Sequence, residues 1–180
     1  MSYSLTGNSW LQLALYFVVL FACVVPLGGY MAKVYQGEKT FMTPVIGWLE
    51  TLFYRISGID KDKDMGWKEY ALTLLLFSFS GFAILYLILI FQGSLPMNPQ
   101  KLPNLSPDLA FNTAVSFITN TNWQSYAGES TMSYFSQMLG LGVQNFLSAA
   151  VGLAVMVALI RGLVRKSSAG IGNFWVDMVR

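Results

Sequence analysis

Three long stretches of the chain carry no charged residue, and each has a strongly apolar centre. They are residues 1–32, 70–100 and 130–160. Each exceeds the roughly 20 residues that a helix needs to cross the hydrocarbon core of a bilayer. The pattern therefore predicts an all-α membrane protein with three transmembrane helices. Buried helices of a soluble protein are the alternative, but these are usually shorter and need more polar cover than this chain offers.

The basic residues predict how these helices are oriented. Six basic residues lie between 33 and 69 and three between 161 and 166, whereas the loop 93–128 has Lys101 as its single basic residue. Because basic loops stay in the cytoplasm, we expect the N-terminus outside and the C-terminus in the cytoplasm. The first stretch has no Lys or Arg before it, so a retained helix is expected rather than a signal peptide. Pro26 is expected to end or kink that helix.

The segment 33–69 is predicted to contain a short amphipathic helix. Pro44 suits a first helical turn, and apolar residues follow at helical spacing: Val45, Ile46, Leu49, Leu52, Phe53 and Ile56. Such a helix either lies along the inner membrane face or packs against neighbouring protein, and both interpretations stay open. The alternating charges of 60–64 indicate a solvated turn.

A second short helix is predicted between the second and third stretches. Ser106, Pro107 and Asp108 favour a helix start, and apolar residues continue to Ile118. Such a helix is roughly 18 Å long. It is too short to cross a bilayer, but its length suits a re-entrant segment.

This short helix leads into a polar stretch, 119–126, that is rich in carbonyl and hydroxyl oxygens. Irregular backbone at membrane depth has to be buried in protein or line a water-filled path. The preceding helix adds about half a negative charge at its C-terminal end, and such oxygens can replace part of the hydration shell of a large monovalent cation. The pattern fits a membrane–pore–membrane unit. It also fits an ordinary extracellular loop with a capped surface helix.

A row of small and polar residues shares one face of the predicted third helix: Gln137, Gly140, Gln144, Ser148 and Gly152. Asn145 lies beside this row. Polar residues in membrane helices usually face a bundle interior or a cavity, which makes Gln144, Asn145 and Ser148 candidates for facing a pore. Packing between helices explains each of them equally well.

The composition excludes several classes of protein. The chain is 54% hydrophobic and 11% charged, and its net charge of +2 does not suggest a nucleic-acid partner. Without histidine, and with Cys23 alone, it has no His-based catalysis, no His-ligated metal and no internal disulfide. Asp108 and Glu129 are isolated carboxylates, so an enzyme is not expected. Glu129 either attracts cations near an outer mouth or is a plain solvated charge.

Several runs of sequence identify a family. They are Leu95–Gln100, Ser106–Phe117, Thr119–Tyr126, Gly128-Glu129, Tyr134-Phe135, Val143–Phe146, Ala158–Arg161 and Gly172–Asp177. These runs closely resemble the KdpA family, the potassium-binding, channel-like subunits of bacterial Kdp potassium pumps. The resemblance covers nearly the whole chain, and the run 112–124 is its most specific part.

The resemblance implies a fold of four membrane–pore–membrane repeats around one pore, of which this chain matches a leading helix and the first repeat. By position, 1–32 is the leading transmembrane helix, 33–69 a cytoplasmic loop with the amphipathic helix, and 70–166 the repeat. The tail 167–180 follows, where family members continue further. Within the repeat, the implied parts are a second helix at 70–92, a pore helix at 107–118, a filter at 119–124 and a third helix at 137–161.

The resemblance also implies which residues bind potassium. The filter residues are Thr119, Asn120, Thr121, Asn122 and Gln124, and dehydrated potassium is coordinated mostly by their backbone carbonyls. Potassium is the substrate, and no covalently bound cofactor is implied. Because the strand has no glycine, Asn120 and Asn122 are expected to adopt positive φ.

Three hypotheses for function follow. In the first, the chain is the non-catalytic, potassium-translocating component of a Kdp-type P-type ATPase in the bacterial inner membrane, with an ATP-hydrolysing subunit and small accessory subunits as partners. One filter strand is too few for a ring of about four, so no pore is expected from a monomer. Missing repeats or self-association would complete it. The second hypothesis is a stand-alone homotetrameric potassium channel, and the third is a non-transporting fragment that binds partner membrane subunits.

Overall fold

The computed structural model describes residues 7–165 and 170–180, and these residues form helices without any strand. Three helices are long and apolar enough to cross a membrane: Gly7–Tyr35, Trp67–Ile90 and Ser136–Val164. This confirms the predicted all-α fold with three membrane spans. Lys166 and residues 1–6, on which predictions also fell, lie outside the described residues. The chain forms two compact units, one reaching to Gly58 and including Arg180, the other spanning Ile59–Val179.

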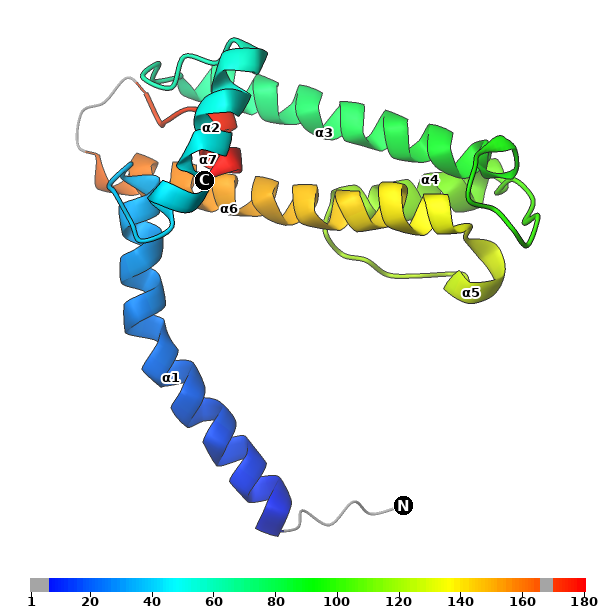
Figure 1. The fold of residues 1–180 in the computed structure, drawn as a ribbon, viewed down its shortest axis with the longest axis horizontal. Coiled ribbons are helices and arrows are strands. Elements are labelled where there is room, and N and C mark those ends of the chain that lie inside the picture. Colours follow the sequence, from blue (N-terminus) through cyan, green and yellow to red (C-terminus); the bar gives the residue numbers. More distant parts are fainter. Residues whose placement is uncertain (1–6, 166–169) are drawn as a thin grey trace. The chain divides into compact units, whose positions relative to one another are not determined.

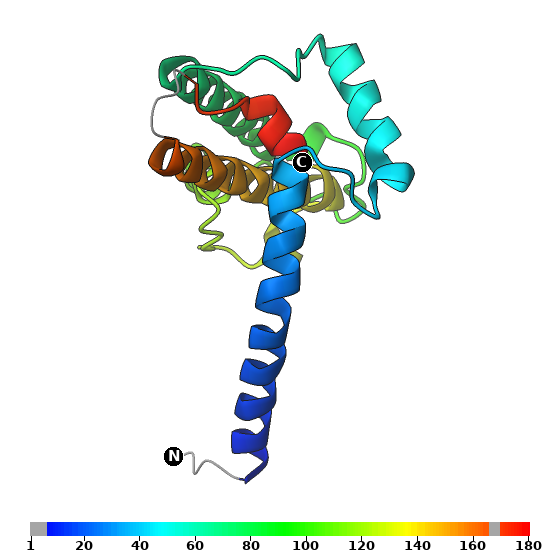
Figure 2. The same cartoon turned by 90° about the vertical axis from the view of Figure 1, so that its left-hand side faces the viewer.

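In the first unit, α1 (Gly7–Tyr35) is one continuous helix. The sequence predicted an end or a kink at Pro26. The helix does not end there: it runs on through Pro26, with a bend along its length (Figures 1 and 2). A proline removes one backbone hydrogen bond and bends a helix. The helix does not end there because the backbone of an apolar span has to satisfy its polar groups internally. None of the described residues of α1 is buried.

The other helix of the first unit is α2 (Thr43–Ser57), which covers the segment where the amphipathic helix is predicted. Its polar side carries a small network. The Tyr54 hydroxyl donates to Glu50 at 2.9 Å, and Arg180 Nε pairs with the same carboxylate at 2.9 Å. Burial and the hydrogen bond to Glu50 raise the pKa of Tyr54. Gly58 ends the helix at φ 64°, a conformation that glycine adopts without strain.

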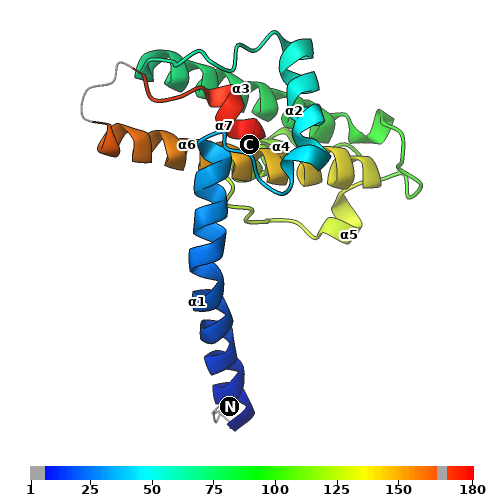
Figure 3. The ribbon, with the colours of Figure 1, turned by 60° about the vertical axis from the view of Figure 1, so that its left-hand side comes forward.

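The second unit is built on an antiparallel pair of helices, α3 and α6, with α4 beside them and α7 at one end (Figures 1 and 3). We call the end near α5 the loop end and the opposite end the α7 end. The bounds are α3 Trp67–Ile90, a 3₁₀ turn η1 Gln92–Ser94, α4 Pro107–Ile118, α5 Gly128–Thr131, a π-helical stretch η2 Ser136–Gly142, α6 Val143–Val164 and α7 Phe174–Val179.

The third span begins as a π-helix rather than an α-helix. The stretch η2 continues without a break into α6, and the wider π turn changes the angular spacing of its residues. Three members of the predicted row of small and polar residues are nevertheless buried toward α3 and α4. Gly140 lies against Leu85 and Ile88, Gln144 faces Gly81, and the Ser148 hydroxyl lies 3.2 Å from Asn120 Oδ1. Gly152, the last member of the row, faces open space.

At the loop end, the side chain of Gln92 ties three segments together. Its Nε2 donates to the carbonyls of Pro103 at 2.6 Å and Thr131 at 2.8 Å. Its Oε1 accepts from the Ser133 N–H at 3.1 Å and the Ser136 hydroxyl at 3.0 Å. Because Gln92 is fully buried and both ends of its amide are satisfied, it fixes the two loops against the end of α3.

An apolar core fills the loop end where α3, α4 and η2 meet. Its buried members are Leu85, Leu89, Leu105, Ala110, Ala114, Phe117, Met132 and Leu141. Two of these are alanines on α4, and small side chains let helices approach each other closely. The core thus holds α4 in a fixed position along α3.

A buried ion pair lies at the α7 end. Arg161 Nη1 of α6 is 2.5 Å from Asp177 Oδ2 of α7, and the Tyr70 hydroxyl of α3 donates to the same oxygen at 3.1 Å. The Asp177 side chain is 1% exposed and that of Arg161 is 18% exposed. A single carboxylate therefore joins three helices through charge-assisted hydrogen bonds.

The charged turn 60–64 also belongs to the α7 end. Its residues are exposed, as predicted for a solvated turn, and Asp64 in addition accepts the Gly172 N–H at 2.7 Å and pairs with Arg165 at 3.1 Å. The Met65 N–H donates to the Gly172 carbonyl at 2.7 Å. The turn thus holds the segment that leads into α7.

Candidate functional site

The candidate site is the segment 119–124, and α4 carries the chain to it. α4 starts beside the end of α3, because the Leu105 N–H donates to the Leu89 carbonyl at 3.2 Å. It ends farther back along α3, where Ile118 lies against Gly81. The chain then returns to the loop end at α5 (Figures 1 and 3). A re-entrant segment requires such a path, which leaves one end of the unit and returns to the same end. The depth of this segment in a membrane stays a prediction.

The start of α4 differs in detail from the expected capped end. Ser106 occupies the N-cap position with extended backbone, but its hydroxyl does not cap a backbone N–H. A hydrogen bond from Ser106, helped by the N–H groups of Asp108 and Leu109, lowers the pKa of Asp108 below its usual range. Asp108 therefore stays ionised at neutral pH and complements the positive end of the helix dipole.

At the other end of α4, the backbone N–H groups of 119–122 all point back to the helix. They donate at 3.0–3.3 Å to carbonyls of its last turn. The acceptors are Val115, Ser116 and Phe117. These bonds satisfy carbonyls that a helix end would otherwise leave unpaired. They use the backbone N–H group of each of the four residues.

The backbone of this segment alternates in handedness. Asn120 has φ 55° and Asn122 has φ 54°, whereas Thr119 has φ −82° and Thr121 is not among the residues with positive φ. This confirms the prediction that the two asparagines take the place of glycine. Alternating right- and left-handed residues make successive N–H groups converge on one side. The carbonyls consequently face the other side.

Those carbonyl oxygens are unpaired. Among the described residues, none donates a hydrogen bond to the carbonyls of 119–122, and all four residues are exposed. A row of such oxygens can coordinate a cation that has lost its water. The C-terminal end of α4, which points at the segment, adds about half a negative charge. The geometry therefore favours a cation held by dipoles.

The threonine hydroxyls are used differently. Thr119 Oγ1 donates to a carbonyl of α4 at 2.9 Å, Thr121 Oγ1 donates to the Ser116 carbonyl at 3.1 Å, and the two hydroxyls lie 3.0 Å apart. Burial raises the pKa of Tyr126, and Gln124 opposes the shift. The two threonine hydroxyls hold the strand in shape, which leaves the backbone carbonyls as the candidate coordinating atoms.

Ser116 is a residue of this site that the sequence did not single out. It is fully buried in α4. Its carbonyl accepts the N–H groups of Thr121 and Asn122, and its hydroxyl donates to the Trp123 carbonyl at 2.9 Å. Ser116 therefore holds the segment in place through both its backbone carbonyl and its side-chain hydroxyl. A serine on an apolar helix has no distinguishing pattern in the sequence, so only the folded backbone reveals this role.

Ser116→Ala should loosen the segment. The variant removes the hydrogen bond to the Trp123 carbonyl, which contributes about 1 kcal/mol and corresponds to about fivefold in a local opening equilibrium. Amide hydrogen exchange of Thr121 and Asn122 should speed up by that factor. Ser130→Ala, which removes an exposed hydroxyl near Ala127, is the matched control and should not change it. If the exchange of these two amides is unchanged in Ser116→Ala, Ser116 does not hold the segment in place.

The three candidates on α6 occupy different places. The Ser148 hydroxyl lies 3.2 Å from Asn120 Oδ1, which brings α6 into contact with the segment. Gln144 is buried with its Oε1 facing Gly81 of α3. Asn145 is exposed. A pore-facing role for these residues stays a prediction.

Comparison with known proteins identifies the family. Residues 14–180 match the family model of KdpA, described as the potassium-transporting ATPase A subunit. The chain belongs to the KdpA family. Three relatives, each named potassium-transporting ATPase potassium-binding subunit, come from Methylobacterium radiotolerans, Sorangium cellulosum and Herpetosiphon aurantiacus. They are 57%, 56% and 58% identical over 98%, 98% and 97% of this chain. The chain spans about 30% of the length of these curated relatives.

Nowhere in 7–165 or 170–180 do three or more His, Cys, Asp or Glu side chains gather as they would to hold a metal ion. The candidate cation ligands of this KdpA-family chain are neutral oxygens, the carbonyls of 119–122. Neutral carbonyl ligands are typical of potassium filters.

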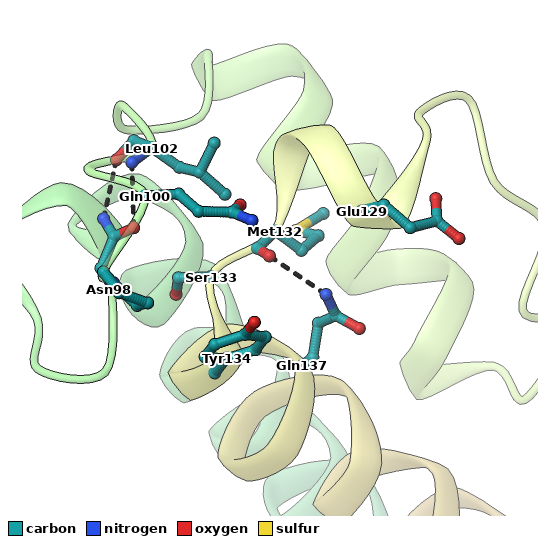
Figure 4. Close-up of a pocket in the computed structure, with 9 residues that line it drawn as sticks. Asn98, Gln100, Leu102, Glu129, Met132, Ser133, Tyr134 and Gln137 are labelled. Atoms are coloured by element: carbon teal, nitrogen blue, oxygen red, sulfur yellow. Dashed lines mark hydrogen bonds between the residues drawn. The ribbon is translucent and has the colours of Figure 1, made fainter.

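This KdpA-family chain also has a pocket of about 280 Å³ at the loop end (Figure 4). It is lined by Asn98, Pro99, Gln100, Leu102, Glu129, Met132, Ser133, Tyr134 and Gln137. In Figure 4, the side-chain amide of Asn98 forms two hydrogen bonds with the backbone of Leu102 and so holds the loop. Gln137 Nε2 donates to the Met132 carbonyl at 3.1 Å. Glu129 is the one acid in the lining, and in Figure 4 its carboxylate points away from the other lining residues. A role for Glu129 in attracting cations stays a prediction.

Proposed function

We propose that this chain supplies a potassium-binding filter strand, residues 119–124, to a Kdp-type ATP-driven potassium uptake system. The observation that carries the proposal is the row of unpaired carbonyls at 119–122, set by alternating φ at the C-terminal end of α4. The names of the relatives support potassium as the ion. They do not favour a stand-alone channel or a non-transporting fragment.

In this proposal the strand replaces the hydration shell of potassium from one side. Carbonyl dipoles and the α4 dipole stabilise the bare cation, while Thr119, Thr121 and Ser116 keep the strand from collapsing. A ring needs about four such strands. The other strands come from further repeats of the subunit or from other chains.

The proposal assigns the chain a non-catalytic role. The work of transport comes from ATP hydrolysis in a partner ATPase subunit, and small accessory subunits complete the assembly. The chain lies in a bacterial inner membrane with its N-terminus outside and C-terminus in the cytoplasm, as the basic residues of 33–69 and 161–166 predict. Helices α3 and α6 flank α4 as the two outer helices of a membrane–pore–membrane repeat.

Thr121→Ala and Gln124→Ala should weaken the potassium affinity of the assembled complex. Loss of the Thr121 hydroxyl removes a hydrogen bond that shapes the strand and is worth about 1 kcal/mol, or about fivefold in affinity. The measurement is potassium-stimulated ATPase activity as a function of potassium concentration. Thr73→Ala, which removes a similar hydroxyl-to-carbonyl bond on α3, is the control. Unchanged potassium dependence in both filter variants would contradict the proposal.

A further inference from the structure

The face that α2 turns away from its polar contacts is apolar. Glu50 and Tyr54, joined to Arg180, mark its polar side. The opposite side carries large apolar side chains that are between 41% and 76% exposed: Val45, Ile46, Trp48, Leu49, Leu52, Phe53 and Ile56. A helix with this arrangement needs an apolar occupant on its open face.

The level of α2 along α1 is fixed by an aromatic contact within the first unit. The ring of Phe41, just before α2, lies 5.4 Å from the ring of Tyr30 on α1, measured between centroids. The uncharged run of α1 ends at Lys33, close to Tyr30. Because α1 has the length and composition of a membrane span, its first charge marks the boundary of the hydrocarbon core. α2 therefore begins at that boundary.

The charges around α2 are mostly positive and unpaired. Lys33, Lys39 and Arg55 are exposed, and none of the ion pairs among the described residues includes them. Glu50 is paired with Arg180, so Glu38 is the one acid of this unit outside an ion pair. Arg55 follows Trp48 by seven residues, so both lie on the same edge of the helix. An aromatic and a basic residue on one edge are typical of the headgroup level of a bilayer.

We propose that α2 is an interfacial helix whose apolar face lies in an anionic phospholipid bilayer, with Arg55 and Lys39 binding the lipid headgroups. The open apolar face supplies the insertion, and the unpaired basic residues supply the preference for anionic lipid. This decides between the two interpretations that the sequence left open for this helix, in favour of lipid. The polar side remains on the water side, where Arg180 contacts Glu50.

The depth of α2 can be measured on the whole chain in lipid vesicles. In a Cys23→Ser background, a fluorescent label is attached through Leu52→Cys on the apolar face or Thr51→Cys on the neighbouring polar side. Brominated lipid should quench the Leu52→Cys label several-fold more than the Thr51→Cys label, and aqueous iodide should do the reverse. A Leu52→Cys label that iodide quenches freely would overturn the proposal. A label that neither agent reaches would mean that protein covers this face, which would also overturn it.

The lipid preference is tested by placing bromine only on phosphatidylglycerol or only on phosphatidylcholine in vesicles that contain both. Phosphatidylglycerol should be enriched around the Leu52→Cys label. Each basic residue near an anionic surface contributes up to about a fivefold preference, so Arg55→Gln should lower the enrichment by up to that factor. Lys101→Gln removes one positive charge from the loop 93–128 and should leave the enrichment unchanged. Equal quenching by the two lipids would overturn the assignment of anionic headgroups.

Discussion

Asn122→Val should raise the potassium concentration that half-activates the assembled complex about tenfold, whereas Asn122→Gly should leave it within about twofold. Asn122 has φ 54°, a left-handed conformation that glycine adopts freely and asparagine tolerates. A β-branched side chain there costs about 1–3 kcal/mol. The strand would then spend most of its time in other shapes, and apparent affinity falls by the fraction of competent strand. The measurement is potassium-stimulated ATPase activity.

The comparison between valine and glycine separates backbone from side chain. Both variants remove the Asn122 amide, so equal loss in both would mean that the amide itself binds the ion or a partner. No loss in either would mean that the conformation of residue 122 does not matter. Both outcomes contradict the proposal that the shape of the backbone makes the site. The same pair of variants at Asn120 would also remove a side-chain contact, because the amide oxygen of Asn120 lies within hydrogen-bond distance of Ser148.

Asp177→Asn should destabilise the chain by about 3 kcal/mol. Removing one partner from a buried ion pair leaves the other charge uncompensated and typically costs about 3–5 kcal/mol. Asp177 is nearly fully buried and receives both Arg161 and the Tyr70 hydroxyl, so its carboxylate also joins α3, α6 and α7. The measurement is the free energy of unfolding in mixed detergent micelles.

An exposed ion pair provides the control for this prediction. Lys63 and Glu69 form a pair whose side chains are 52% and 45% exposed, and such pairs contribute about 1 kcal/mol or less. Lys63→Gln should therefore change the free energy of unfolding by less than about 1 kcal/mol. If Asp177→Asn costs no more than Lys63→Gln, the pair does not hold the α7 end together.

Much of the fold could be predicted from the sequence, because long uncharged apolar stretches are most stable as helices within a bilayer. The three apolar stretches became helices that are able to span a membrane. The positive φ of Asn120 and Asn122 could also be predicted, since the strand has no glycine and few other residues tolerate that region. In both cases a strong local preference agrees with the global fold.

The parts that could not be predicted depend on contacts between distant residues. The π-helical start of the third span does not follow from local propensity. At Pro26 local rules allow either an end or a kink, and the structure shows that α1 continues, as a span in lipid keeps its backbone bonds. Asp64 has the pattern of a solvated charge until Gly172 and Arg165 are brought beside it by the fold.

Coordination of potassium by the filter strand can be observed at its carbonyl groups. In the assembled complex, threonine labelled with ¹³C at the carbonyl reports on Thr119 and Thr121, which are assigned by the loss of each resonance in Thr119→Ser and Thr121→Ser. If these carbonyls coordinate potassium, both resonances shift and saturate over the potassium range that activates the ATPase. Resonances that stay unchanged while the ATPase saturates would contradict coordination by these carbonyls.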